Sequence, residues 1–198
     1  MNLQIMLGVS CIRDRSDTAE VMMRFIRIQR KRGNMTVNII RCDNSGENKS
    51  FEEEALNSTD LNLKFEYTAP YTPEQNGKVE RKYQTLYGKT RAMLNTALLP
   101  MSVRNKCWAQ CAALATILDN LTVSGPKDIC ARTKYYGSVP RWTSGHLRKF
   151  GEIGIVHNTK NQKIRSKLED RGFPAMFVGY PAETHSPDVY QMWNIKSQ

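Results

Sequence analysis

Residues 71–91 read YTPEQNGKVERKYQTLYGKTR, and this stretch places turn residues directly before a basic helix. The turn residues fill positions 72–77, and apolar residues then repeat at three- and four-residue steps from 79 to 98, which predicts a long amphipathic helix. The apolar stripe consists of Tyr83, Leu86, Thr90, Met93 and Ala97. One acidic residue, Glu80, lies at the margin of the stripe among five cations, Lys78, Arg81, Lys82, Lys89 and Arg91. A carboxylate among cations at a loop mouth is typical of a site that handles phosphates.

The charge of the whole chain points to the same class of partner. Its 198 residues include 29 Lys and Arg against 19 Asp and Glu, which gives a net charge of +10. Such a balance favours a polyanion as partner, nucleic acid first and an anionic membrane surface second. The alternative is a soluble protein that is merely basic. No apolar run approaches the length of a membrane span, so we predict no membrane partner.

The five cysteines do not show the spacing of a zinc site or of a disulfide framework. Cys107 and Cys111 lie four residues apart in an apolar helical segment, so we expect both to be buried as small hydrophobic residues. The chain also lacks the basic start and the cleavage site of a signal peptide. These features favour a reducing, intracellular compartment.

Upstream of the opening stretch, the pattern predicts an alternation of strands and helices. The expected elements are a strand over 3–12, a helix over 17–33, a strand over 35–41, a helix over 50–57 and a strand over 61–67. The second strand delivers Asp43 at its carboxyl end. One helix and one strand then return the chain to the same edge of the sheet, where Glu80 follows.

Asp43 and Glu80 are therefore the candidate catalytic and metal-binding pair. Two carboxylates on rigid elements suit Mg²⁺, which binds few protein oxygens and keeps water or phosphate oxygens in its other positions. Such ions can activate a hydroxyl group and stabilise the leaving oxygen of a phosphodiester. The alternative is that Asp43 is an ordinary turn residue and that Glu80 belongs to a solvated helix face with i,i+4 ion pairs.

After residue 98, the sequence pattern changes twice. A helix is predicted over 102–121 with Trp108 facing inward, and Gly and Pro residues then indicate a linker over 123–145. Three short strands follow, at 153–157, 175–180 and 189–193, and they suggest a small barrel. The expected domains are thus a core over 1–122, the linker, and a small β-domain over 146–198.

Two motifs resemble a known family. RCDNSGEN around Asp43 and APYTPEQNGKVERK around Glu80 are similar to the integrase core of copia-type long-terminal-repeat retrotransposon polyproteins. HLRKFGEIGIVH over 146–157 and KLEDRGFPAMFVGY over 167–180 resemble the Src-homology-3-type barrel that follows this core. The resemblance covers nearly the whole chain.

The resemblance implies an α/β, RNase H-like fold and a metal-dependent polynucleotidyl transferase that joins the ends of element DNA to target DNA. In this family two Asp and one Glu bind Mg²⁺ or Mn²⁺, and the motifs match Asp43 to the second Asp and Glu80 to the Glu. The first strands and the first Asp would then lie upstream of Met1. We therefore expect this chain alone to be inactive as a strand-transfer enzyme.

Two other functions stay open. One is a non-enzymatic module that binds nucleic acid through Lys78, Arg81, Lys82, Lys89 and Arg91, and the other is a nuclease of RNase H type on the same scaffold. Under the integrase hypothesis, the expected partners are element DNA and target DNA, and the chain could also form a homo-oligomer. The expected location is the nucleus or a cytoplasmic element particle.

Overall fold

The structure is a computed structural model, and it describes residues 7–32, 37–69, 73–123, 129–137, 144–157, 170–181 and 188–195. Contacts divide the chain into two compact units, Met1–Thr85 with Asn120–Val139, and Leu86–Asp119 with Pro140–Gln198. The described residues form one sheet of two strands and one sheet of three, together with several helices. The predicted mixed α/β class is confirmed. The grouping into units differs from the predicted boundaries, because the helix that carries Glu80 contributes to both units.

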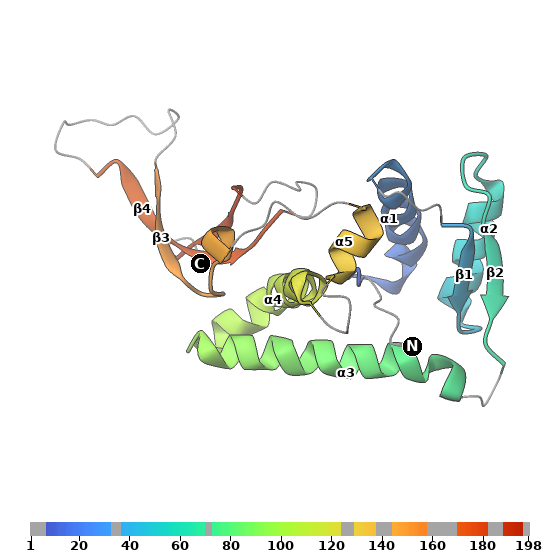
Figure 1. The fold of residues 1–198 in the computed structure, drawn as a ribbon, viewed down its shortest axis with the longest axis horizontal. Helices are drawn as coiled ribbons and strands as arrows, with labels where there is room; N and C mark the ends of the chain where they lie inside the picture. Colours follow the sequence, from blue (N-terminus) through green and yellow to red (C-terminus); the bar gives the residue numbers. More distant parts are fainter. Residues whose placement is uncertain are drawn as a thin grey trace. The chain divides into compact units, whose positions relative to one another are not determined.

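The first unit is built on a parallel strand pair. Its elements are η1 (Arg15–Asp17), α1 (Thr18–Arg32), β1 (Ile39–Cys42), α2 (Gly46–Asn57), β2 (Lys64–Tyr67), the start of α3 (Pro73–Thr96) and α5 (Ala131–Tyr136). β1 and β2 pair from Ile39 opposite Lys64 to Cys42 opposite Tyr67, and Figure 1 shows their common direction. Parallel strands need a crossover connection, and α2 supplies it.

The core of the first unit lies between its helices and its strands. The buried residues are Ala19 and Ile26 of α1, Phe51 and Ala55 of α2, and Leu61 and Leu63 before β2. The alternation of buried residues before β2 is the one predicted from the sequence. The ring of Phe51 meets the ring of Phe65 edge to face, with centroids 5.1 Å apart, a favourable geometry for aromatic pairs.

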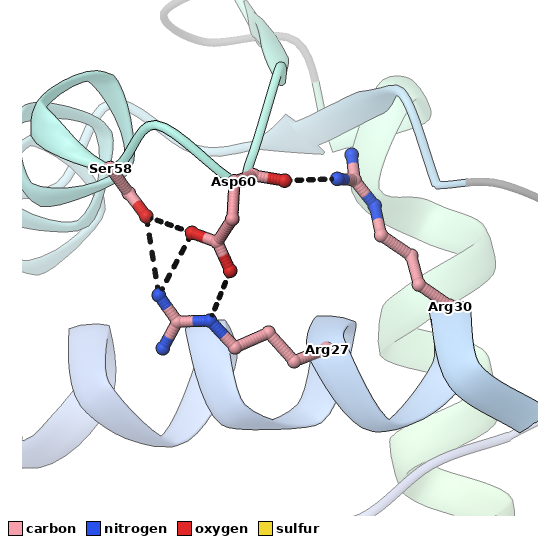
Figure 2. Close-up of polar contacts among 4 residues, drawn as sticks. All are labelled: Arg27, Arg30, Ser58 and Asp60. Carbon is pink, nitrogen blue, oxygen red and sulfur yellow. Dashed lines mark hydrogen bonds and ion pairs between the residues drawn. The ribbon is translucent and has the colours of Figure 1, made fainter.

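Two arginines of α1, Arg27 and Arg30, form hydrogen bonds with the segment between α2 and β2 (Figure 2). Nε of Arg27 donates to Oδ2 of Asp60 at 2.7 Å, and its Nη2 donates to Oδ1 of Asp60 at 3.1 Å and to Oγ of Ser58 at 3.2 Å. Nη1 of Arg30 donates to the carbonyl oxygen of Asp60 at 2.8 Å, while its Nη2 donates to that of Val37 at the same distance. The hydrogen bonds from Arg27 and Ser58 hold the pKa of the Asp60 carboxyl well below its usual range.

Replacing Asp60 by alanine is expected to lower the melting temperature at pH 7 but not at low pH. A depressed carboxyl pKa contributes stability above the pKa of the unfolded chain, about 4, and this contribution is lost as the pH falls through the lower folded value. The difference in melting temperature between wild type and Asp60→Ala should therefore shrink below about pH 4. Glu54→Ala, at an exposed position of α2, is the control. A difference that stays constant down to pH 2 would contradict the expectation.

Three predictions for the first unit need correction. Residues 7–12 form no strand, and the backbone of Leu7 bonds to a side chain instead of to a neighbouring strand: its N donates to Oδ1 of Asn120 at 2.8 Å and its O accepts from Nδ2 at 2.7 Å. α2 begins at Gly46 after Ser45 instead of at Ser50. The predicted linker contains the short helix α5, which starts after Cys130. Residues 3–6 lie outside the described part.

The second unit packs the end of α3 and most of α4 (Met101–Leu121) against a sheet. The α4 residues in this core are Cys107, Cys111 and Leu114, which confirms the two cysteines as buried hydrophobic residues. All cysteines of the chain are free thiols. Trp108 lies one position beyond this stripe and is 46% exposed, so its predicted inward orientation is wrong.

The sheet of the second unit is antiparallel, in the order β3 (Ile153–His157), β4 (Gly172–Gly179), β5 (Gln191–Asn194) (Figure 1). The three predicted strands are thus confirmed, and closure into a barrel stays a prediction. The short helix η2 (Ser144–His146) precedes the sheet. Gly151 has φ of 85°, and a Cβ there would lie 2.8 Å from Cβ of Ala97, so only glycine fits this position.

Candidate functional site

Asp43 lies where the sequence places it, directly after the carboxyl end of β1. It is exposed, and its carboxylate is oriented by Asn48 from the first turns of α2. Nδ2 of Asn48 donates to Oδ1 of Asp43 at 2.6 Å and to its carbonyl oxygen at 3.2 Å. One carboxylate oxygen of Asp43 is therefore held by the protein, and the side chain faces solvent.

Other polar groups gather at the same edge of the sheet. Oη of Tyr67, opposite Cys42 in register, donates to Oε2 of Glu52 at 2.5 Å. This hydrogen bond, with burial and the charge of Glu52, raises the pKa of Tyr67 to about 12. Burial first, and then the charges of Asp43 and Glu52, raise the pKa of the Cys42 thiol. The edge that carries Asp43 is therefore electronegative.

Removing the hydroxyl with Tyr67→Phe should abolish one late tyrosine ionisation. In the wild type this group should lose its proton only near pH 12, and ultraviolet absorbance follows the step. Because the pKa of Tyr67 is higher in the folded chain than in the unfolded chain, its hydrogen bond to Glu52 contributes to folding stability. This contribution is complete below the unfolded pKa of about 10 and is lost as the pH rises through the folded pKa. Glu52→Gln should move the ionisation back toward that ordinary value. A late ionisation that survives in Tyr67→Phe would belong to another tyrosine.

Glu80 lies exposed near the start of α3. The predicted turn over 72–77 is corrected, because α3 already begins at Pro73; Thr72 lies outside the described residues. Among the described residues, no hydrogen bond or ion pair joins Asp43 to Glu80, and no group of three His, Cys, Asp or Glu side chains could hold a metal ion. The carboxylate oxygens of Asp43 and Glu80 are of the kind that Mg²⁺ binds, and their role as its ligands stays a prediction.

The predicted DNA-binding cations occupy two flanks of α3. Lys78, Lys82 and Lys89 recur at steps of four and seven residues and share one flank, and Arg81 lies beside them. Arg91 lies eleven residues after Glu80, three helical turns along the same flank as that carboxylate. Lys89 is already engaged, because its ammonium group forms an ion pair with Asp119. Lys78, Arg81 and Arg91 are exposed.

Sequence reasoning missed two kinds of residue at this site. Asn48 carries no catalytic signal, and only its position in the first turns after Asp43 could have suggested the contact. Tyr83 was assigned to the apolar stripe of α3, but it is 54% exposed, whereas Leu86 and Thr90 of that stripe are buried. Tyr87 is exposed to the same extent. The cations that flank these tyrosines in the sequence could have indicated that both side chains are exposed.

The motifs, the mixed fold and the basic helix together define a class, an integrase-like region of the kind found in retrotransposon Pol polyproteins. The chain is 30% identical over 195 residues to the Retrovirus-related Pol polyprotein from transposon TNT 1-94 of Nicotiana tabacum. The match covers 95% of this chain and 13% of the polyprotein, so the chain spans about an eighth of that relative. The resemblance to an integrase-like, copia-type region is confirmed.

Two further comparisons complete the picture. A solved simian T-cell lymphotropic virus intasome in complex with PP2A regulatory subunit B56 gamma contains a chain that is 16% identical, with a TM-score of 0.48. The similarity covers 93% of this chain and 63% of that chain. No protein-family model matches the sequence. Within the described ranges, no helix combines the length and the apolar character needed to cross a membrane.

Proposed function

We propose that this chain is the DNA-binding part of a retrotransposon integrase and that it does not transfer DNA strands by itself. The observation that carries the proposal is the set of exposed cations, Lys78, Arg81 and Arg91, on the helix α3 that also carries the motif residue Glu80. Element ends and target DNA are the proposed ligands. The net charge of +10 supports a polyanionic partner.

The cations of α3 would contact phosphates. Lys and Arg on one helix can follow a nucleic-acid backbone, and each phosphate that they neutralise releases counterions. Lys78, Arg81 and Arg91 are the strongest candidates because their side chains are exposed. Lys89 is a weaker candidate, since binding a phosphate would compete with its ion pair to Asp119.

Asp43 and Glu80 would be the oxygen ligands that this chain offers to Mg²⁺ or Mn²⁺. The family motifs match two carboxylates in the chain, and two carboxylates neutralise a divalent ion less well than three. We therefore expect weak metal binding and no strand transfer from the chain alone. Assembly into a homo-oligomer, in the nucleus or in an element particle, belongs to the same proposal.

DNA binding by the full chain tests the proposal directly. Fluorescence anisotropy with a labelled duplex should show an affinity that falls steeply with salt and changes little when Mg²⁺ is replaced by a chelator. Absence of binding at low salt would overturn the DNA-binding proposal. Glu80→Gln should bind DNA as well as the wild type or better, because it removes a negative charge from the basic helix.

A strand-transfer assay tests the second half of the proposal. With Mg²⁺ or Mn²⁺, the chain should give no joined product, and Asp43→Asn and Glu80→Gln should be indistinguishable from wild type. Robust joining that Glu80→Gln abolishes would show that the chain is an active integrase. Cleavage of the RNA strand of an RNA–DNA hybrid, abolished by the same substitution, would instead assign a nuclease of RNase H type.

A further inference from the structure

One flank of α4 exposes large apolar side chains. Met101 is 67% exposed, and Trp108, which is also exposed, lies seven residues after it. Seven residues make about two helical turns, so the two side chains lie on the same flank, about 10 Å apart along the axis. Leu98, three residues before Met101, is 86% exposed. All three residues belong to the second unit. Large apolar side chains that gather on a surface mark an interaction site.

The backbone of Leu98 has an unfavourable conformation. Its φ of 51° lies in the left-handed region, which bulky residues rarely adopt. Glycine is the usual residue at such a position after the end of a helix, and α3 ends at Thr96. The fold therefore holds a strained leucine whose side chain adds almost nothing to the core. Packing within the second unit does not explain why a leucine stands there.

A cation without an anion lies between the two apolar side chains of α4. Arg104 is three residues after Met101 and four before Trp108, so it shares their flank. Its Nε donates to the carbonyl oxygen of Leu99 at 2.8 Å, and its Nη1 donates to Oδ1 of Asn95 at 2.8 Å. Both acceptors are neutral, and among the described residues no carboxylate pairs with Arg104. The protein thus orients the guanidinium group and leaves its charge uncompensated.

The charges around this flank select the kind of ligand. Residues 86–118 contain four Lys or Arg and no Asp or Glu. A second copy of the chain would bring the same cations to the flank, and like charges repel. The phosphates of a nucleic acid could pair with Arg104 but would leave the side chains of Leu98 and Met101 uncovered. A protein segment that carries both carboxylates and apolar side chains complements both features.

The shape of the flank favours a helix as the ligand. Met101, Arg104 and Trp108 recur at steps of three and four residues, and side chains at these steps form the ridges that interdigitate with a second helix. Met, Arg and Trp are also enriched at protein interfaces, where Trp and Arg contribute most to binding. The flank is only two turns long, which suits a small, transient interface.

We propose that Met101, Arg104 and Trp108 form a docking flank for an amphipathic, acidic helix of a partner protein. The apolar side chains of that helix cover Met101 and Trp108, and one of its carboxylates pairs with Arg104. Leu98 extends the apolar contact beyond the start of α4. This inference goes beyond the proposed DNA binding, because it assigns a protein partner to the second unit.

Three designed peptides test the inference with the full chain. The labelled peptides form helices of about four turns, roughly fourteen residues, with the same leucine flank and with Glu, Gln or Lys at the neighbouring positions. In fluorescence anisotropy, the wild type should bind the Glu peptide roughly two- to fivefold more tightly than the Gln peptide, and the Lys peptide least. Trp108→Ala should weaken binding of the Glu peptide by roughly thirtyfold. Arg104→Gln should remove the preference for Glu over Gln.

Matched variants separate the docking flank from other effects. Lys106→Gln removes the same charge from another side of α4 and should keep the preference for Glu. Arg104→Lys retains the charge and should retain part of the preference, and circular dichroism checks that the helices of each variant are intact. The inference is overturned if the wild type does not bind the Glu peptide or binds all three peptides equally. It is also overturned if Trp108→Ala binds the Glu peptide as tightly as the wild type.

Two other ligands identify a different occupant of the docking flank. Vesicles of phosphatidylserine and phosphatidylcholine test a membrane surface, and a labelled duplex tests DNA. Trp108→Ala should bind both as the wild type does. If this substitution weakens binding to vesicles or to the duplex while the Glu peptide is not bound, the flank serves a lipid surface or a nucleic acid, and the proposed protein partner is wrong.

Discussion

Phe177→Ala is expected to lower the free energy of unfolding of the second unit by about 3–5 kcal/mol. Phe177 is 2% exposed in the middle of β4. Its ring meets the rings of Tyr180 and Tyr190 edge to face, with centroids 5.2 and 5.9 Å away. Alanine would remove these ring pairs and leave a cavity that the surrounding residues cannot fill without moving. Such a loss is a large fraction of the stability of a small domain.

Urea denaturation followed by tryptophan fluorescence measures this effect. Trp108 and Trp193 fall within the second unit, so their emission reports its unfolding. Met101→Ala is the control, because Met101 is an exposed apolar residue whose truncation should change stability by less than about 0.5 kcal/mol. Equal losses of stability in the two variants would show that Phe177 is not a core residue.

The second large effect concerns DNA binding. Replacing Lys78, Arg81, Lys82 and Arg91 together by glutamine should make the slope of log affinity against log salt less negative by about 0.9 for each phosphate that is no longer neutralised. If all four cations neutralise a phosphate in the wild type, the slope changes by about 3.6. With equal affinities of variant and wild type at 1 M salt, the affinity of the variant at 0.1 M salt is then lower by roughly four thousandfold. Lys89 is left in place because it is paired with Asp119.

A matched variant guards against a mere change in net charge. Lys49, Lys64, Lys106 and Lys134 are exposed cations outside α3, and replacing all four by glutamine gives the same net charge. This control should retain nearly the full salt dependence of the wild type. A control that loses as much affinity as the α3 variant would show that binding is diffuse and that α3 is not the interface.

Elements with strict periodicity could be predicted from the sequence. The alternation of Leu61 and Leu63 reports directly which side of the chain is buried, and β2 follows within the predicted range. α1 and α4 also begin within a residue of the predicted positions. In these segments the burial period and the local propensity agree, and such agreement makes an element predictable.

The secondary-structure predictions were wrong where a local sequence signal is compatible with more than one structure. Pro73 indicates a turn in many contexts, but at the first helical position its missing N–H costs nothing and its fixed φ suits a helix. Leu7–Ile12 is apolar, yet the backbone of Leu7 is satisfied by the side chain of Asn120, 113 residues away. No local pattern can anticipate a hydrogen bond at that separation.

For the candidate site, too, some features could be predicted from the sequence and others could not. Motif matching could place Asp43 and Glu80 on their elements, since both motifs are long and specific. It could not reveal that Asn48 holds the carboxylate of Asp43, because that hydrogen bond depends on where α2 begins. Trp108 and Tyr83 were misassigned because a shift of one position on a helix turns a side chain by about 100°, enough to move it from core to solvent.

The buried residues of the first core cluster lie close together in the sequence, and this determines when the cluster can form during synthesis of the chain. Every buried member, from Ala19 to Leu63, lies within the first third of the sequence. This cluster can therefore form while the ribosome is still adding α3. The cluster of the second unit joins Cys107 to Tyr180 and includes Trp193 at its margin, so it forms only after residues far downstream of α3 have been added. Vectorial folding, in which amino-terminal parts form first, would leave the second unit exposed to proteases after the core of the first has become protected.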